Sequence, residues 1–349
     1  MNKYYTRACN FYYGSKSKAY IKNKKSIPLN GYNYISFDKI EIIDRKRTKI
    51  INIKDISKLP NKLKNKVNRD LKKITKQKIL NKLRSSDIPI LMGIINLTPD
   101  SFSDGGKYNK KNLAKKRVNS LLSSGAKIID VGGESTRPGA NDIHPKKEWD
   151  RVKGILKILK NKKSFISLDT RKSFVMEKAS KIKIDLVNDV SGLSYDNETI
   201  NYLKKTKKPF VIHHMKGTPK NMQIKPTYKN VLLDIYDFFE TKLKYLRKQG
   251  IKHNNIILDP GIGFGKNLKH NIILLKNISI FHSLGLPIML GLSRKRFIKD
   301  ISKENDTKDR IGGTVSSCIQ AYLQGVQILR VHDVKEINQA FKVFRELQN

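Results

Sequence analysis

The sequence predicts a (β/α)8 TIM barrel that follows a basic N-terminal extension. Eight short apolar runs rich in Ile, Val and Leu recur between residues 90 and 329, and segments with helical periodicity separate them. Strands that alternate with helices form parallel βαβ units, and eight such units in about 260 residues fit a closed barrel better than the competing doubly wound sheet. We therefore divide the chain into an extension, residues 1–89, and a barrel, residues 90–349.

The extension carries a higher density of basic residues than the barrel. It holds 24 lysines and arginines against 6 acidic residues, in a chain whose formal net charge is +42. Within it, the alternating runs Tyr32–Ile43 and Thr48–Ile53 predict a β-hairpin that turns at Asp44–Arg47 and could plug the bottom of the barrel. After Pro60, apolar residues recur at helical spacing, which predicts one helix docked on the outside of the barrel. These residues are Leu63, Val67, Leu71 and Ile74, and Leu80 extends the series.

The barrel strands are expected at the eight apolar runs. In chain order these are Ile90–Ile95, Lys127–Val131, Phe165–Leu168, Ile184–Val187, Phe210–Ile212, Ile256–Leu258, Ile288–Leu290 and Val326–Leu329. The segments between them place apolar residues three or four positions apart, as at Leu113, Val118 and Leu121, which predicts helices with one buried face.

Polar side chains follow all eight expected strands. They occur at Asn96, Asp130–Ala140, Asp169–Lys172, Asn188–Ser191, His213–Gly217, Asp259–Lys266, Ser293–Lys295 and Arg330–Asp333. A single polar residue after a strand often only caps the next helix, but eight such clusters exceed what capping requires. Because the C-terminal ends of the strands carry the active site in TIM barrels, we predict an active site at this end.

Four aspartates stand within about three residues of these apolar strands, although the chain has only 30 acidic residues against 72 basic ones. They are Asp130, Asp169, Asp189 and Asp259. A carboxylate near a buried strand requires a partner, because its burial costs several kcal/mol. Two or three carboxylates and an amide form a receptor for a ligand edge with several N–H donors, and an aminopyrimidinone fits this description best.

These motifs closely resemble those of the dihydropteroate synthase family. The resemblance rests on NLTPDSFSDGG (96–106), GGESTRPGA (132–140), Asp169, NDVSG (188–192), HMKGTPKNMQ (214–223), LDPGIGFGK (258–266), SRKRFI (293–298) and RVHD (330–333). It implies a transferase of folate biosynthesis. Such an enzyme condenses 6-hydroxymethyl-7,8-dihydropterin diphosphate with para-aminobenzoate to give 7,8-dihydropteroate and diphosphate.

The resemblance also implies a role for each matching residue. Asp259, Asp169 and Asn188 would hold the donor edge of the pterin, Lys295 would lie near its carbonyl, and Met215 would contact the substrate. The other matching positions serve the diphosphate and the second substrate. Asn96 would coordinate Mg2+ together with diphosphate oxygens, and Arg137, Arg330 and His332 would bind the diphosphate.

A third group of residues would close over the site and form the aminobenzoate pocket. It comprises Phe102, Asp104, Thr136, Arg137 and Pro138, beside Phe264, Ser293 and Lys295. In this family the bond to diphosphate breaks largely before the new bond forms. The implied catalytic residues, which assist departure of the diphosphate or stabilise the resulting cation, are Asp104, Arg137, Lys295, Arg330 and His332.

Three alternatives compete with this interpretation. The positive charge suits a nucleic-acid binder, but the excess is spread along the chain as compositional drift would spread it, so we do not expect nucleic acid as a partner. A non-catalytic pterin-binding homologue should have lost the diphosphate residues, and they are present. A pterin-dependent methyltransferase would not need the SFSDGG loop, residues 101–106.

Location and assembly follow from weaker signals. Two cysteines without a CxxC pair suit a reducing compartment, and no apolar run is long enough to span a membrane. We expect a cytoplasmic protein, with an organelle as the alternative because the first acidic residue is Asp38. The family resemblance implies a homodimer formed through the later barrel helices.

Overall fold

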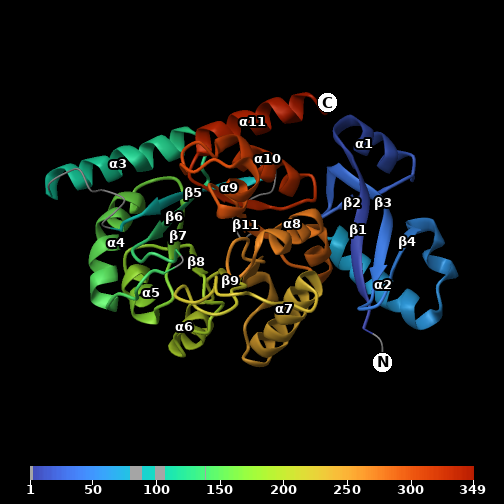
Figure 1. Ribbon diagram of the computed structural model, residues 1–349, viewed down its shortest axis with the longest axis horizontal. Coiled ribbons are helices and arrows are strands. Elements are labelled where there is room, and N and C mark those ends of the chain that lie inside the picture. Colours follow the sequence, from blue (N-terminus) through green and yellow to red (C-terminus); the bar gives the residue numbers. More distant parts are fainter. Residues whose placement is uncertain (1–2, 79–88, 99–106, 138) are drawn as a thin grey trace.

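The computed structural model describes residues 3–78, 89–98, 107–137 and 139–349, with the backbone alone at 107–111. Figure 1 shows a barrel with helices around it, and the N-terminal extension beside it. The expected Leu80 of the extension helix lies outside the described residues.

Eight parallel strands form the barrel, as the sequence predicts. They are β5 (Ile90–Asn96), β6 (Ile128–Gly132), β7 (Phe165–Asp169), β8 (Leu186–Asp189), β9 (Phe210–His213), β10 (Ile256–Asp259), β11 (Met289–Gly291) and β12 (Ile328–Val331). Their spatial order is β10-β9-β8-β7-β6-β5-β12-β11, and a parallel bridge between Leu258 and Ile288 joins β10 to β11. The barrel is therefore closed, which rules out the open, doubly wound sheet.

Most strands reach further at their carboxyl ends than their apolar runs indicate. The register pairs Asn96 with Gly132, Gly132 with Asp169, and Asp169 with Asn188. These polar residues are thus part of the ladder rather than of the loops, because parallel pairing continues past the last apolar residue. The ladder consequently holds Asn96, Asp169 and Asn188 at one level of the barrel, with Gly132 of β6 between Asn96 and Asp169.

Helices cover the outside of the barrel (Figure 1). They are α3 (Lys107–Ser123), α4 (Pro145–Lys160), α5 (Ser173–Ser180), α6 (Glu198–Thr206), α7 (Val231–Lys248), α8 (Leu268–Lys276), α9 (Arg296–Ser302), α10 (Ile311–Tyr322) and α11 (Val334–Glu346), with short 3₁₀ turns η4 (His253–Asn255) and η5 (Ile278–Leu284). In α3, Val118 and Leu121 are buried as expected, but Leu113 is 45% exposed. The apolar spacing therefore extends beyond the part of α3 that packs on the strands.

The extension contains more structure than the sequence indicates. It comprises β1 (Tyr5–Tyr13), α1 (Gly14–Lys22), β2 (Ile27–Leu29), β3 (Tyr32–Ile43), β4 (Thr48–Asn52), the turn η1 (Ile53–Lys58) and α2 (Asn61–Thr75). The expected hairpin is β3 with β4, and the expected helix is α2. The unexpected β1 pairs along the other edge of β3. Its charged and polar residues, such as Arg7 and Asn10, interrupt the alternation that would have predicted a strand.

The extension packs on the flank of the barrel and does not plug its bottom. An apolar cluster fills the lower interior of the barrel, and among the described residues no member of the extension belongs to it. The hairpin turn instead reaches α7, where Arg45 donates to Asp234 at 2.8 Å and to Asp237 at 2.7 Å. Ser279 of η5 donates to the backbone oxygen of Ala8 in β1 at 3.0 Å. The expected plug is therefore wrong, because the hairpin binds the helix layer and the barrel strands fill their own interior.

Tyr5 provides a direct test of this junction. Its ring is fully buried against Tyr236 of α7 in an edge-to-face contact with 5.1 Å between ring centroids, and its hydroxyl donates to Asp237 at 2.9 Å. We expect Tyr5→Ala to lower the free energy of unfolding by about 3–5 kcal/mol, since it leaves a cavity. Tyr5→Phe, the control, removes only the hydrogen bond and should cost about 1 kcal/mol. Urea denaturation measures both, and equal effects of the two variants would contradict the packing.

Candidate active site

The centre of the strand ends is an arginine held between two aspartates. Arg330 of β12 donates from Nε to Asp130 at 2.6 Å and from Nη2 to Asp169 at 2.7 Å. Asn188 donates to the same oxygen of Asp130 at 3.2 Å. The Arg330 side chain is 20% exposed, whereas those of Asp130 and Asp169 are 0% and 6% exposed. The guanidinium thus joins the buried carboxylates to the open end of the barrel.

Burial and charge act against each other in this cluster. Burial opposes the charge of Arg330, but Asp130 and Asp169 outweigh it and hold the pKa of Arg330 above its ordinary value. Desolvation raises the pKa of Asp169 to about 7, although Arg330 opposes this rise. Asp169 is therefore poised to titrate near neutral pH, and a donor placed against it favours its ionised form.

Asp259 forms a second acidic position across the barrel. It lies at the end of β10, is 4% exposed and accepts a hydrogen bond from the backbone N–H of Gly261 at 2.8 Å. Desolvation raises its pKa to about 6. Desolvation also lowers the pKa of Lys295 to about 8, and Asp259 partly offsets this effect. The pair offers an acceptor and a donor whose proton affinities have moved towards each other.

The loop from Gly261 to Lys266 owes its shape to glycine and to a buried lysine. Gly261 has φ +71°, and a Cβ there would lie 2.0 Å from the backbone oxygen of His214, so no larger residue fits. Lys266 is 2% exposed and donates to His214 Nδ1 at 3.0 Å, to the His214 oxygen at 3.3 Å and to the Phe264 oxygen at 2.8 Å. These contacts hold the backbone at Phe264, and the centroid of its ring lies 4.1 Å from Lys295 Nζ.

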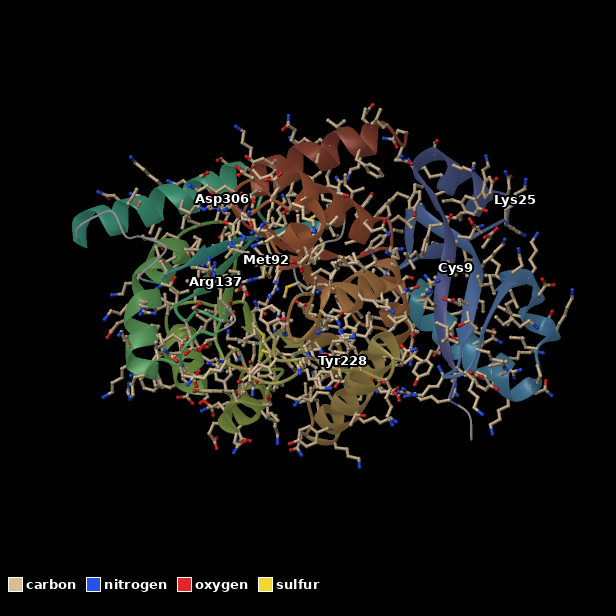
Figure 2. The ribbon with its side chains drawn as sticks, viewed as in Figure 1. Cys9, Lys25, Met92, Arg137, Tyr228 and Asp306 are labelled. Atoms are coloured by element: carbon tan, nitrogen blue, oxygen red, sulfur yellow. The ribbon has the colours of Figure 1, made fainter. Side chains whose placement is uncertain are left out.

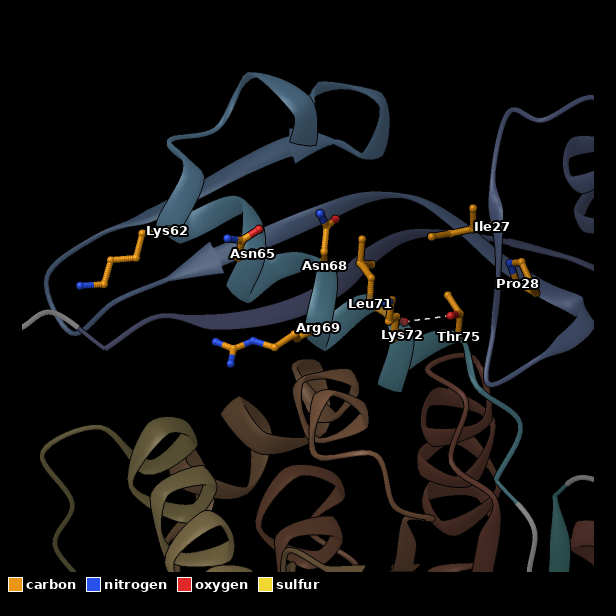
Figure 3. A pocket seen from close by; sticks show the side chains of 9 residues that line it. All are labelled: Ile27, Pro28, Lys62, Asn65, Asn68, Arg69, Leu71, Lys72 and Thr75. Carbon is orange, nitrogen blue, oxygen red and sulfur yellow. Dashed lines mark hydrogen bonds between the residues drawn. The ribbon is translucent and has the colours of Figure 1, made fainter.

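Most of the residues predicted to hold the pterin line one cavity at these strand ends. The lining consists of Asn188, Val190, His213, Asp259, Ile262, Phe264, Gly291, Lys295 and Arg330. The cavity measures about 20 Å3, room for about one water molecule. A ring-shaped ligand therefore requires the long side chains of Lys295 and Arg330 to move. A much larger groove of about 1070 Å3 runs along α2 in the extension, and no strand-end residue of the barrel lines it (Figure 3).

Ser293 and His332 form a pair beside Arg330. The Ser293 hydroxyl lies 3.1 Å from His332 Nδ1 and accepts the His332 backbone N–H at 3.3 Å. Burial, assisted by the charge of Arg330, lowers the pKa of His332 to about 3. His332 is thus neutral at physiological pH, where it can act as a hydrogen-bond donor but not as a cation. Ser293 fixes its orientation.

The remaining predicted residues lie around this centre. Asn96 is half-buried, and a Cβ on the intervening Gly132 would lie 3.6 Å from its amide oxygen and 3.4 Å from Asp169 Oδ2. Thr136 is half-buried and Arg137, which Figure 2 labels, is exposed on the loop after β6; neither residue lines the cavity. Met215 is half-buried and does not line the cavity. The predicted Phe102, Asp104 and Pro138 lie outside the described residues.

Sequence reasoning gave no role to two residues that organise the site, Asp130 and Lys266. Asp130 was recognisable as a strand aspartate, but its partner Arg330 lies 200 positions away in the chain. Lys266 ends a glycine-rich run, whose glycines permit a bent backbone and whose buried backbone oxygens need a donor. That signal was present in the sequence, although it does not identify the acceptors.

Comparison with known proteins gives a consistent result. A family described as pterin binding enzyme matches residues 92–332. The chain is 40% identical over 264 residues to the dihydropteroate synthase of Neisseria meningitidis serogroup C, a match that covers 75% of this chain and 93% of that protein. It is 39% identical over 256 residues to the dihydropteroate synthase of Escherichia coli strain K12, covering 73% and 90% of the two chains.

Solved structures agree with these relatives. A Yersinia pestis dihydropteroate synthase in a sulfonamide drug complex is similar with a TM-score of 0.71 and 39% identity, over 76% of this chain and 96% of that one. A Xanthomonas albilineans dihydropteroate synthase with 4-aminobenzoic acid is similar with a TM-score of 0.71 and 34% identity, over 75% and 94%. In each case the shared part corresponds to about three quarters of this chain.

The raised pKa of Asp259 predicts a pH-dependent stability. Its pKa in the folded protein, about 6, exceeds the ordinary value of 3.8. The protonated carboxyl therefore contributes its full share to the free energy of unfolding below about pH 4, and this share is lost as the pH rises through about 6. Asp259→Asn can still accept the Gly261 N–H and does not titrate. We expect the variant to gain about 1–3 kcal/mol over the wild type between pH 4 and pH 8. Urea denaturation across this range measures the difference, and a constant difference would contradict the burial of an ionised carboxylate.

Proposed function

This chain belongs to the pterin-binding enzyme family, and we infer that it is a dihydropteroate synthase. It is a transferase that condenses 6-hydroxymethyl-7,8-dihydropterin diphosphate with para-aminobenzoate to give 7,8-dihydropteroate and diphosphate. The observation that carries this conclusion is that its relatives of about 40% identity over most of the barrel are dihydropteroate synthases. The strand-end cavity has the donors and acceptors that such a reaction requires.

We propose that the cavity binds the pterin ring through acceptors on three strands. Asn188 Oδ1 is buried and has no hydrogen-bond partner among the described residues, so a ligand N–H would satisfy it. Asp259 has one oxygen left after Gly261, and Asp169 lies next to Asn188 in the strand register. Lys295 supplies the donor for the ring carbonyl. Hydrogen bonds from the ring's N–H groups would replace those that burial removed, and they would stabilise the charged form of the two carboxylates.

We propose that the diphosphate lies on the side of Arg330 that faces away from the pterin ring, towards β5 and β12. Arg330 supplies a charge and His332 a neutral donor, and the exposed Arg137 reaches the diphosphate only if its loop moves inward. Cations and donors at this position stabilise the departing diphosphate more than the bound ester, which lowers the barrier. The buried carboxylates beneath the ring then favour the pterin methylene cation, and we propose that Asp104 of the first loop adds to this field.

The residues present fit a Mg2+ ion bound jointly with the substrate. Among the described residues no side-chain hydrogen bond engages the Asn96 amide, and no group of three or more His, Cys, Asp or Glu side chains could hold a metal unaided. Mg2+ commonly takes one or two protein oxygens and completes its octahedron with phosphate oxygens and water. When bound, it neutralises charge on the leaving diphosphate. Asn96 would be its ligand from this chain.

We propose that para-aminobenzoate enters beside Phe264, between the cavity and the loops after β5 and β6. Phe264 provides an apolar face, and Lys295 and Ser293 provide polar contacts. Thr136 of the second loop, with Phe102 and Pro138, would complete this pocket. Met215 would border the pterin from the β9 side. Ser293 would then serve two purposes, since it also orients His332.

We further propose a cytoplasmic homodimer. Cys9 and Cys318 are both free, as suits a reducing compartment. Within the described residues, no helix combines the length and apolarity needed to cross a bilayer. The later helices expose large apolar side chains, with Ile301 on α9 and Val343 on α11 both 56% exposed. A second copy of the chain would cover such residues.

The assay of this function uses pterin diphosphate, para-aminobenzoate and Mg2+, with chromatographic detection of dihydropteroate. We expect product from the wild type. Asp259→Asn should raise the KM for the pterin at least tenfold, because an NH2 donor then faces a ligand donor. Asp70→Asn is the matched control, since Asp70 is a carboxylate of the extension that is only 2% exposed. Absence of product from folded wild-type protein would refute the proposed function.

The metal ligand is tested separately. We expect a chelator to abolish synthesis and Mg2+ to restore it. Asn96→Ala should require about tenfold more Mg2+ for half-maximal rate, because one oxygen ligand is lost. Titration of the rate with Mg2+ measures this requirement at saturating substrates. An unchanged requirement in a folded Asn96→Ala variant would remove Asn96 from the metal site.

A further inference from the structure

A buried network of ionic side chains lies behind the active site, at the base of the loop that follows β6. It joins Glu134, Glu148, Arg171 and Lys172, whose side chains are 3%, 0%, 5% and 3% exposed. None of the four lines the strand-end cavity. The proposed chemistry therefore leaves this network without a role.

Glu134 is the centre of the network, and both of its carboxylate oxygens are fully used. Oε2 accepts from Arg171 Nε at 3.1 Å and from Nη2 at 2.8 Å. Oε1 accepts from Lys172 Nζ at 2.7 Å and from the backbone N–H of Ile143 at 3.0 Å. Charged partners and a backbone donor thus surround one carboxylate.

The network clamps both ends of the same loop. Glu134 opens the loop, and Asp142 and Ile143 close it. Arg171 also donates to Asp142 at 2.9 Å, and Lys172 also donates to the backbone oxygen of Ile143 at 2.8 Å. Between its two ends the clamp leaves a short segment, here called the arch, of which the structure describes residues 135–137 and 139–141 and which carries Thr136 and Arg137. Arg171 and Lys172 follow Asp169 within three positions, so one short segment after β7 carries both clamping cations and the carboxylate proposed to bind the pterin.

Stability alone gives little reason for such a cluster. Desolvation of buried ions offsets much of their attraction, so a buried ion pair is weak evidence for stability, whereas its geometry is restrictive. Arg171 directs two N–H groups at one oxygen of Glu134, which restricts the direction of the guanidinium as well as its distance. Gly133 adds a further restriction, since a Cβ there would lie 2.9 Å from the Glu148 backbone oxygen.

We propose that Glu134 and Arg171 are positioning residues that fix both ends of the arch from which Thr136 and Arg137 serve the sites for para-aminobenzoate and the diphosphate. This proposal rests on the proposed function. They touch neither substrate and act through Thr136 and Arg137. Asn188 and Asp259 hold the pterin ring from β8 and β10, which lie outside the clamp, so the affinity for the pterin should change little when the clamp is lost.

The test compares Glu134→Gln with Asp70→Asn, a matched loss of a buried carboxylate in the extension. For Glu134→Gln we expect the amides of residues 135–142 to exchange hydrogen about tenfold faster. The KM for para-aminobenzoate should rise about tenfold. The Kd for 6-hydroxymethylpterin without diphosphate, measured by calorimetry, should stay within about twofold. Asp70→Asn should change none of the three.

Two further variants keep the test decisive if Glu134→Gln folds poorly. Asp142→Asn alters a side chain that is 51% exposed and should give a smaller rise in the same KM. Arg171→Lys retains the charge and should restore part of what Arg171→Met loses. Three results would each overturn the proposal. They are unchanged hydrogen exchange in the arch, an unchanged KM for para-aminobenzoate despite faster exchange, and a parallel loss of affinity for the pterin. If the wild type makes no product, the proposed function fails, and the exchange measurement alone still decides whether the clamp holds the arch.

Discussion

The structure depends on burying several carboxylates at the end of a barrel in a chain that is otherwise strongly basic. Asp130, Asp169 and Asp259 are each at most 6% exposed. In the described structure a single guanidinium, that of Arg330, compensates the first two directly. The barrel closes with β12 beside β5, and this closure brings Arg330 across to the aspartates of β6 and β7. Fold and site are thus coupled through one side chain.

This arrangement suits a ligand with donors on its ring and negative charge beyond it. Desolvation raises the pKa values of Asp169 and Asp259, so burial disfavours the charged form of both carboxyl groups. Ring N–H donors, or a cation formed on the ring, relieve this unfavourable state, so part of the desolvation energy acts in favour of binding and of ionisation. The same argument supports the proposed place of Arg330 between the two halves of the substrate, because its guanidinium binds carboxylates on one side and would bind phosphate oxygens on the other.

The sequence predicted the barrel because each strand is a short apolar run and each run is followed by polar residues. It could also place Asn96, Asp169 and Asp259 at the strand ends, since register in parallel strands follows from the runs themselves. It could not predict the pairing of Arg330 with Asp130, which depends on closure of the barrel across 200 residues. Nor did it show β1, whose polar residues conceal its alternation, or that the hairpin binds α7, which depends on where Asp234 and Asp237 lie. The clamp on Glu134 likewise arises from the loops after β6 and β7 and from α4, which only the fold brings together.

The most direct measurement of the central claim is the number of protons exchanged when 6-hydroxymethylpterin binds. Calorimetry in two buffers of different ionisation enthalpy gives this number at each pH. If buried carboxylates with pKa values of about 6 and 7 receive the ring's donors, binding between pH 6 and 7 should release protons, and the release should vanish above about pH 8. Proton uptake, or binding without proton exchange across this range, would contradict the account.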